Sequence, residues 1–162
     1  MKRASTVVAA AALALAPIAH AQITCTDVNV ITAAASDDFA NLAGDELGDD
    51  LYKSSHLIAG ANSCAVDLFL EAVHSCVWNF TSQTDAIRTY NANVSAIAPC
   101  LSAWQANAMK IDEVPLDGTR VTAGMSYVGS GAFEYLEWMV VLEEVVSGQP
   151  SPYRMWVELV YY

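Results

Sequence analysis

Two of the three histidines, His56 and His74, lie near residues that could cooperate with them in catalysis. Ser54 and Ser55 precede His56, and a serine hydroxyl activated by an imidazole base is the nucleophile of many hydrolases. No nucleophile-elbow sequence surrounds these serines, however. His74 shares one side of an alternating β-prone run with Cys76, which favours a buried structural histidine. The sequence therefore points to no catalytic residue, and we expect a protein without enzymatic activity.

Four carboxylates stand close together in the sequence, at Asp45, Glu46, Asp49 and Asp50. Calcium prefers several such oxygens in a flexible loop, but the order of acids, glycine and distant glutamate that defines an EF-hand is missing. The histidines also lack an acidic or cysteine partner at the spacing typical of zinc ligands. We therefore expect a solvated loop at 45–50, and neither a metal ion nor a cofactor.

The four cysteines, Cys25, Cys64, Cys76 and Cys100, favour two structural disulfides. Zinc-binding and redox-active cysteines come in closely spaced pairs, whereas the nearest two here are much farther apart. A hairpin that turns near Leu70 places residues 64 and 76 opposite each other on one face. We therefore predict the pairs Cys64–Cys76 and Cys25–Cys100, the second joining the start of one helix to the end of another.

The first 21 residues are typical of a cleavable export signal. Lys2 and Arg3 precede an apolar run over 4–16, and the small-residue sequence 19–21 follows. The apolar run is shorter than the roughly 20 residues that a membrane-spanning helix needs. We expect cleavage after Ala21, leaving residues 22–162 as one periplasmic or secreted domain that does not insert into a membrane.

The formal net charge of −11 at pH 7 becomes −13 when the export signal removes Lys2 and Arg3. Such an acidic protein repels phosphate backbones and anionic lipid surfaces, which argues against nucleic acid as a partner. A protein partner with a basic surface is compatible with this charge. The alternative is that the charge only keeps an exported protein soluble.

The hydrophobic pattern predicts an α+β fold with two helices and two groups of strands. Pro99 falls inside the second helical pattern and should kink or shorten that helix. The middle strand of the last group also fits a helix face, so that alternative stays open. The expected elements are a helix from Thr24 or Thr26 to near Gly44, a short strand at 56–59, a hairpin of 64–70 and 73–80, a long amphipathic helix over 82–104, a linker over 112–118, and a three-stranded antiparallel meander of 120–128, 133–146 and 153–162.

The meander is also the expected partner surface. It holds more than half of the aromatic residues, and alternation lets only about half of each strand face the helices. Tyrosine and tryptophan are enriched where proteins bind one another. We expect Tyr135, Trp156 and Tyr161 to contribute, and the strand 153–162 to offer an edge for strand addition. The alternative is that this surface packs on both faces.

Four short segments carry a resemblance, namely Phe39, Ala59-Gly60-Ala61, Cys76-Val77-Trp78 and Cys100-Leu101. Over residues 25–104 they resemble a group of small uncharacterised exported bacterial proteins with a four-cysteine α+β domain. The resemblance implies secretion and a disulfide framework, and it implies no activity. The order of elements is also similar to that of small secretion-chaperone-like folds, which is an analogy of topology.

These observations favour an exported, disulfide-stabilised, non-enzymatic protein-binding module of the inhibitor, immunity-protein or assembly-factor type. One alternative is a small periplasmic hydrolase that uses His56 or His74. It loses its basis if the two histidines lie far from each other and from every carboxylate. The other alternative is a carrier of a small apolar ligand, which requires an enclosed apolar cavity of about 300 Å³ or more between the sheet and the helix 82–104.

Overall fold

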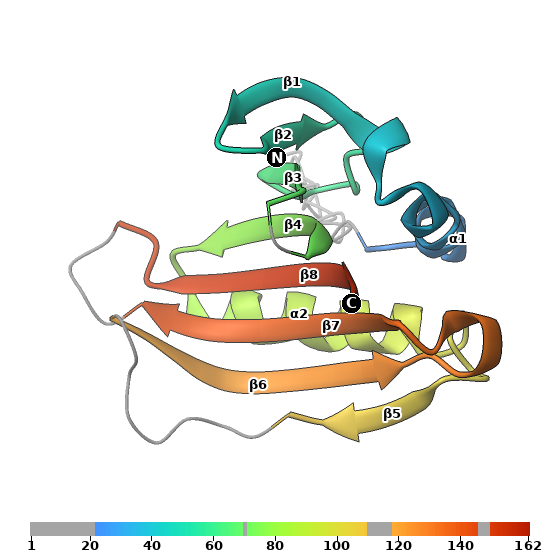
Figure 1. The fold of residues 1–162 in the computed structure, drawn as a ribbon. Helices are drawn as coiled ribbons and strands as arrows, with labels where there is room; N and C mark the ends of the chain where they lie inside the picture. The colour runs from blue at the N-terminus through green and yellow to red at the C-terminus, as the bar shows by residue number, and fades with distance from the viewer. Residues whose placement is uncertain (1–21, 70, 110–117, 146–149) are drawn as a thin grey trace, which may run out of the picture.

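The structure, a computed structural model, describes residues 22–69, 71–109, 118–145 and 150–162, and in them one antiparallel sheet dominates (Figure 1). Its eight strands run in the order β1-β2-β3-β4-β8-β7-β6-β5. With two helices, the class is α+β as predicted. The strands are β1 Ala43–Gly48, β2 Leu51–Ser54, β3 Ser63–Asp67, β4 Ala72–Phe80, β5 Gln105–Ala108, β6 Thr119–Val128, β7 Leu136–Val145 and β8 Tyr153–Tyr161. The helices are α1 Cys25–Ala34 and α2 Gln83–Ile97, with short 3-10 turns η1 Ala35–Asp37, η2 Ala40–Leu42 and η3 Gly131–Phe133. The predicted export signal, the predicted turn residue Leu70 and most of the predicted linker 112–118 lie outside the described residues.

Helix α2 crosses one face of the sheet behind β7 and β8 (Figure 1). Its first turn is capped by Ser82, whose hydroxyl accepts the backbone N–H of Asp85 at 3.4 Å. The helix ends at Ile97, two residues before Pro99. The predicted shortening of this helix is therefore confirmed. Ala98 keeps a helical conformation, but Pro99 has no backbone N–H with which to continue the helical hydrogen bonds.

Helix α1 is shorter than the sequence predicts. Thr24 and Asp27 form a reciprocal capping box at its start, but the helix ends at Ala34 rather than near Gly44. Asp38 and Phe39 adopt left-handed backbone conformations, with φ of 47° and 60°. A bulky residue rarely adopts a positive φ. Here the fully buried Phe39 side chain, and its N–H bond to the Ala34 carbonyl at 2.9 Å, hold the turn.

The segment 45–50 is not a loop, and the short strand expected at 56–59 is absent. Instead β1 and β2 form a hairpin that curves over one side of the sheet (Figure 1). Asp49 and Asp50 occupy its turn with φ of 50° and 60°, the signs that a tight hairpin turn requires. The acidic β1 sequence has little intrinsic strand preference. It forms a strand because β2 pairs with it on one side and with β3 on the other.

The predicted hairpin and meander are parts of one continuous sheet rather than separate units. Strand β8 pairs along its length with both β4 and β7, so that Val157 lies between Cys76 and Val140. The prediction that 153–162 offers a free edge is therefore wrong, and the outer strands are β1 and β5. The middle segment of the meander is the strand β7 rather than a helix.

The two faces of the sheet differ because the helices cover only one of them. On the covered face, Trp138 is fully buried and its indole N–H donates to the Thr32 hydroxyl of α1 at 3.1 Å. His74, Cys76 and Trp78 of β4 point to the same side and are buried. The alternation seen in the sequence thus identifies the inner face of β4 correctly.

Both disulfides join the predicted pairs. Cys64 and Cys76 lie directly opposite each other on β3 and β4. Cys25 at the start of α1 is bonded to Cys100, which follows the end of α2. A bridge across 75 residues restricts the unfolded chain strongly and fixes α1 against α2.

Candidate functional site

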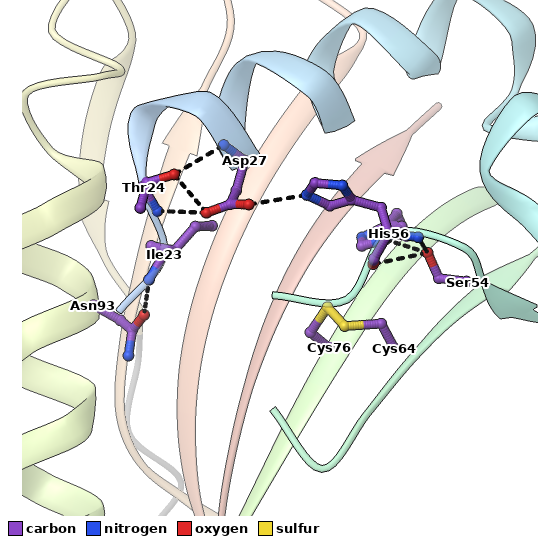
Figure 2. Close-up of polar contacts among 9 residues, drawn as sticks. Ile23, Thr24, Asp27, Ser54, His56, Cys64, Cys76 and Asn93 are labelled. Carbon is purple, nitrogen blue, oxygen red and sulfur yellow. Dashed lines mark hydrogen bonds and ion pairs between the residues drawn. A yellow bond between two sulfur atoms is a disulfide. The ribbon is translucent and has the colours of Figure 1, made fainter. Parts of the chain in front are cut away.

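A buried polar cluster surrounds Ser54, the residue that the sequence suggests as a nucleophile (Figure 2). The Ser54 hydroxyl accepts the N–H of His56 at 3.1 Å and donates to the His56 carbonyl at 3.0 Å. His74 Nε2 lies 2.9 Å from the same hydroxyl. The Ser54 hydroxyl has a single proton. When it donates that proton to the His56 carbonyl, the hydrogen bond with His74 must be donated by the protonated Nε2. The Ser54 hydroxyl then donates one hydrogen bond and accepts two.

His56 turns away from Ser54 and binds a carboxylate on α1 (Figure 2). Its Nε2 lies 3.0 Å from Asp27 Oδ1. The second carboxylate oxygen accepts the backbone N–H and hydroxyl of Thr24, at 2.8 and 2.6 Å. Burial raises the pKa of Asp27, but these bonds and His56 outweigh it, so the pKa lies below its ordinary value. Asp27 therefore joins α1 to the loop after β2.

A further hydrogen bond connects the start of α1 to α2. The N–H of Ile23 donates to Asn93 Oδ1 at 2.9 Å, and both residues are buried. Asn93 also donates to the carbonyl of Thr89 in the preceding helical turn. The polar contacts around Ser54, Asp27 and Asn93 thus tie three parts of the fold together, which favours a structural role for them.

The hydrolase alternative would lose its basis if both histidines lay far from each other and from every carboxylate. His56 contacts the carboxylate of Asp27, so this condition is not met. The contacts of the two histidines argue against catalysis in another way. The carboxylate is bound to His56, whereas the imidazole beside the Ser54 hydroxyl is that of His74. Burial lowers the pKa of His74 to about 4, which makes it a weak base at neutral pH. Ser54 borders a surface hollow of about 410 Å³, but its hydroxyl is engaged in the cluster.

Metal-ligating side chains do not gather within the described part of the chain. No group of three or more histidines, cysteines or carboxylates there is placed to hold a metal ion. Asp45 and Glu46 are exposed on β1, whose pairing with β2 is irregular at this point.

Among residues 22–69, 71–109, 118–145 and 150–162, no helix combines the length and apolar character needed to cross a membrane.

A different part of the surface is hollowed where β8 ends beside η1. One hollow of about 500 Å³ contains three carboxylates, and we call it the acidic hollow. The carboxylates come from the turn after α1 and from the residue just before β4, and two tyrosine residues also line the hollow. Its lining residues are Asp37, Asp38, Ala40, Leu68, Glu71, Ala72, Tyr161 and Tyr162.

A second hollow of about 330 Å³ lies on the other side of Tyr161, and we call it the apolar hollow. Helix α1, its 3-10 continuation and the η3 turn form its walls. The Phe133 ring on its rim stacks on Trp104 at a centroid distance of 5.7 Å. Its lining residues are Thr32, Ala35, Ser36, Ala132, Phe133, Tyr135, Leu136 and Tyr161. The two hollows together are called the cleft.

Three of the four exposed aromatic side chains of the described residues line this cleft. Phe133 and Tyr135 line the apolar hollow, Tyr162 lines the acidic hollow, and Phe69 lies in the β3–β4 turn between the lining residues Leu68 and Glu71. Their exposures are 64% for Phe69, 57% for Tyr135 and Tyr162, and 44% for Phe133. No described lysine, arginine or histidine lines either hollow.

The charge around the cleft is correspondingly negative. The Tyr162 hydroxyl donates to Glu137 Oε2 at 2.9 Å. Burial raises the pKa of Tyr162 to about 12, and the neighbouring carboxylates of Glu137, Glu71 and Glu158 add to this effect. Nothing in the described part of the chain forms an ion pair with Asp37, Asp38 or Glu71. The cleft thus combines exposed rings with uncompensated negative charge.

The structure separates the three residues predicted to form a partner surface. Tyr135 and Tyr161 line the same hollow. Trp156 points to the opposite face of the sheet, where it lies between Val77 and Val141. Sequence reasoning missed the three carboxylates and Tyr162 as members of the surface. Asp37 and Asp38 are adjacent acids in a turn, but nothing in their spacing connects them to Glu71.

The helix-free face of the sheet carries buried and half-buried charged side chains beside Trp156. Arg154 donates to Glu143 Oε2 through Nη2 at 2.6 Å and through Nε at 3.0 Å. Glu158 lies farther along β8 on this face. Burial, with a smaller contribution from the Glu143 charge, raises the pKa of Glu158 to about 7. Glu158 is therefore partly protonated near neutral pH.

A hollow between α2 and the sheet bears on the carrier alternative. It measures about 280 Å³, which is smaller than the cavity expected for a small-molecule site. Its walls include Ile87 and Tyr90 of α2, and Leu142 and Tyr153 of the sheet. This hollow gives the carrier hypothesis little support.

Comparison with protein-family models, curated proteins and solved structures finds no match to this chain. The resemblance to exported four-cysteine proteins therefore stays a prediction, and a functional assignment depends on the geometry.

Proposed function

We propose that the protein is an exported, non-enzymatic protein-binding module, and that its partner binds in the cleft. The observation that carries this proposal is that three exposed aromatic residues, Phe133, Tyr135 and Tyr162, line one cleft that also holds three uncompensated carboxylates. Tyrosine is enriched among the residues that dominate binding energy. Uncompensated negative charge favours a partner with a basic surface and accelerates its association. An inhibitor, an immunity protein or an assembly factor would each use such a surface.

The cleft is built on parts of the fold that are firmly held. The Cys25–Cys100 disulfide anchors α1, which forms one wall. The buried Phe39 ring fixes the left-handed turn that presents Asp37 and Asp38. A surface that is already ordered before binding loses less conformational entropy when the partner arrives. This rigidity supports recognition by complementary shape and charge.

Export to an oxidising compartment is also part of the proposal. The two disulfides support it, since such bonds persist in the periplasm or outside the cell and are rare in the cytosol. The signal-like residues 1–21 give independent support, with cleavage proposed after Ala21. Mass spectrometry of the protein recovered from the producing cell tests the cleavage site.

The test of the binding function compares two triple variants of the mature protein, residues 22–162. The variant Asp37→Asn, Asp38→Asn, Glu71→Gln neutralises the cleft. The control Asp45→Asn, Glu46→Gln, Asp49→Asn removes the same charge from the exposed β1–β2 hairpin. We expect the unmodified protein and the control to capture the same partner from the envelope fraction of the source cells, identified by mass spectrometry. The cleft variant should capture at least tenfold less, because complementary charge is lost. Equal capture by both variants contradicts the proposed surface.

The absence of catalysis has its own test. Purified mature protein is incubated with p-nitrophenyl esters and with a casein substrate, and release of product is measured beside the Ser54→Ala variant. We expect equal background rates, because the Ser54 hydroxyl is engaged with His56 and His74. Turnover that disappears on Ser54→Ala would show that the protein is a hydrolase.

A further inference from the structure

The two hollows of the cleft differ in chemistry and share one wall. We infer that the cleft recognises an extended protein segment bearing an aliphatic side chain and a lysine or arginine side chain two residues apart. The aliphatic side chain enters the apolar hollow, the cation enters the acidic hollow, and Tyr161 lies between them. This inference rests on the proposed function, because it specifies the partner of the same surface.

The apolar hollow fits a hydrocarbon side chain. Ala35, Ala132 and Leu136 supply aliphatic lining and three aromatic residues add their rings, while Thr32 and Ser36 contribute hydroxyl groups. Burial of apolar surface is favourable at about 25 cal/mol per Å². Lys or Arg carbon stems can cover such a hollow, but their charged ends need a carboxylate or water. A branched aliphatic side chain is therefore the better occupant.

The acidic hollow fits a cation carried on a long side chain. Asp37, Asp38 and Glu71 line it from two different segments, yet they do not form a group that could hold a metal ion within the described residues. A guanidinium or ammonium group tolerates this wider spacing, because it binds carboxylates through several separate N–H donors. The rings of Tyr161 and Tyr162, which also line this hollow, add favourable faces for a cation.

The spacing of the two occupants follows from the shared wall. In an extended segment, residues i and i+2 point to the same side and lie roughly 7 Å apart. That separation places one side chain on each side of a single residue such as Tyr161. The segment cannot bind by adding a strand to β8, because β4 and β7 already occupy both edges of β8. Recognition therefore depends on side chains, and their spacing becomes a measurable requirement.

The test uses blocked synthetic peptides and the mature protein, residues 22–162, with affinity measured by NMR titration. The reference peptide contains Gly-Leu-Ser-Arg-Gly. In one comparison peptide glutamate replaces arginine, in a second serine replaces leucine, and in a third leucine and arginine are adjacent. We expect each change to weaken binding about tenfold or more, since each leaves one hollow empty or places like charges together. Equal affinity for all four peptides overturns the inference.

Two variants assign the occupants to the hollows. Ala132→Leu fills the apolar hollow from an exposed turn, and Ala103→Leu is its control at an exposed position outside both hollows. Ala132→Leu should reduce the affinity for the reference peptide and abolish the advantage of leucine over serine. Glu71→Gln should instead reduce the advantage of arginine over glutamate. If neither preference changes, the peptide binds elsewhere and the inference is wrong.

These outcomes separate this inference from the proposed function. Loss of partner capture in the cleft triple variant, with no peptide preference for the Leu-Ser-Arg spacing, would leave the docking surface standing and refute the two-part recognition. Unchanged partner capture in that variant would refute the docking surface itself.

Discussion

The polar cluster around Ser54 and the cleft around Tyr161 use ionisable residues in opposite ways. In the cluster, His74 and Asp27 are buried or half-buried and each has specific hydrogen-bond partners. In the cleft, exposed carboxylates such as Asp37 have no cationic partner among the described residues. The residue types of the cluster suggest catalysis, yet its contacts use those groups for structure. The residue types of the cleft are ordinary, but its groups remain available to a partner.

Under the proposed function, the difference indicates which property separates structural polar groups from binding groups in this fold. Perturbed pKa values occur at functional sites and in structural networks alike. His74 has a strongly lowered pKa because it is buried, and it lies in a satisfied network. The more useful sign is a polar or aromatic group that stays exposed on a rigid wall without a partner. Stability and binding measurements should therefore respond to different substitutions in the two regions.

The largest expected change in the free energy of unfolding follows a substitution in the polar cluster around Ser54. His74→Ala removes a fully buried ring and one hydrogen-bond partner of Ser54. We expect the free energy of unfolding to fall by about 3 kcal/mol, from the cavity and the lost bond together. Urea denaturation of the oxidised mature protein measures it. A loss below about 1 kcal/mol would contradict the structural role of this cluster.

The pH dependence of the free energy of unfolding reports on His74 without a substitution in the cluster. The His74 pKa is 6.5 when unfolded and about 4 when folded. As the pH falls through this interval, the unfolded state takes up the proton first, so this group lowers stability. Glu158 acts in the opposite direction, with a pKa of 4.5 unfolded and about 7 folded. Its folded form takes up the proton first, so it raises stability as the pH falls.

The two groups should nearly cancel in the unmodified protein. Glu158→Gln removes the opposing contribution, so the variant should lose about 2 kcal/mol of unfolding free energy between pH 7 and pH 5. The unmodified protein and the control Glu46→Gln, at an exposed residue of β1, should change little over the same interval. If the free energy of unfolding had the same pH dependence in all three proteins, the opposing contributions assigned to His74 and Glu158 would be wrong.

A smaller effect is expected for the bridge between His56 and Asp27. Both side chains are partly exposed, at 24% and 17%, so water can replace part of the lost interaction. We expect His56→Ala to lower the unfolding free energy by about 1 kcal/mol. Hydrogen exchange should also become faster in the first turn of α1, where Asp27 caps the helix. Unchanged exchange there would show that the bridge does not hold α1.

The smallest stability effect is expected for the cleft. The Asp37→Asn, Asp38→Asn, Glu71→Gln variant should change the unfolding free energy by no more than about 0.5 kcal/mol, although it loses its partner. Asparagine tolerates the left-handed conformation of residue 38, so the turn is preserved. Thermal unfolding beside the partner assay measures both properties. A loss comparable to that of His74→Ala would mean that the cleft residues are structural and would erase the contrast.

Features that depend on local pattern could be predicted from the sequence. The alternation of His74, Cys76 and Trp78 identified the inner face of β4, and it also set the register that pairs Cys64 with Cys76. Pro99 and Ser82 bounded the second helix because capping and proline geometry are local. The two disulfides followed from the placement of these elements.

Features that depend on distant pairing could not be predicted. The acidic β1 sequence lacks strand propensity, and only its pairing with β2 makes it a strand. The contact between Asp27 and His56 joins residues far apart in the chain, and neither spacing nor periodicity indicates it. The cleft has the same origin, since Asp37 and Glu71 meet only after α1 and β4 dock on the end of β8.

The central place of β8 also has a consequence for the order in which the chain can fold. The strands β1 to β4 and β5 to β7 are synthesised before β8, but they become one sheet only when β8 is inserted between β4 and β7. Until then, β4 and β7 each present an unpaired edge open to another chain. Such late, long-range pairing slows folding. The sheet therefore closes only after residues 153–161 have been synthesised, so the first seven strands cannot complete it on their own.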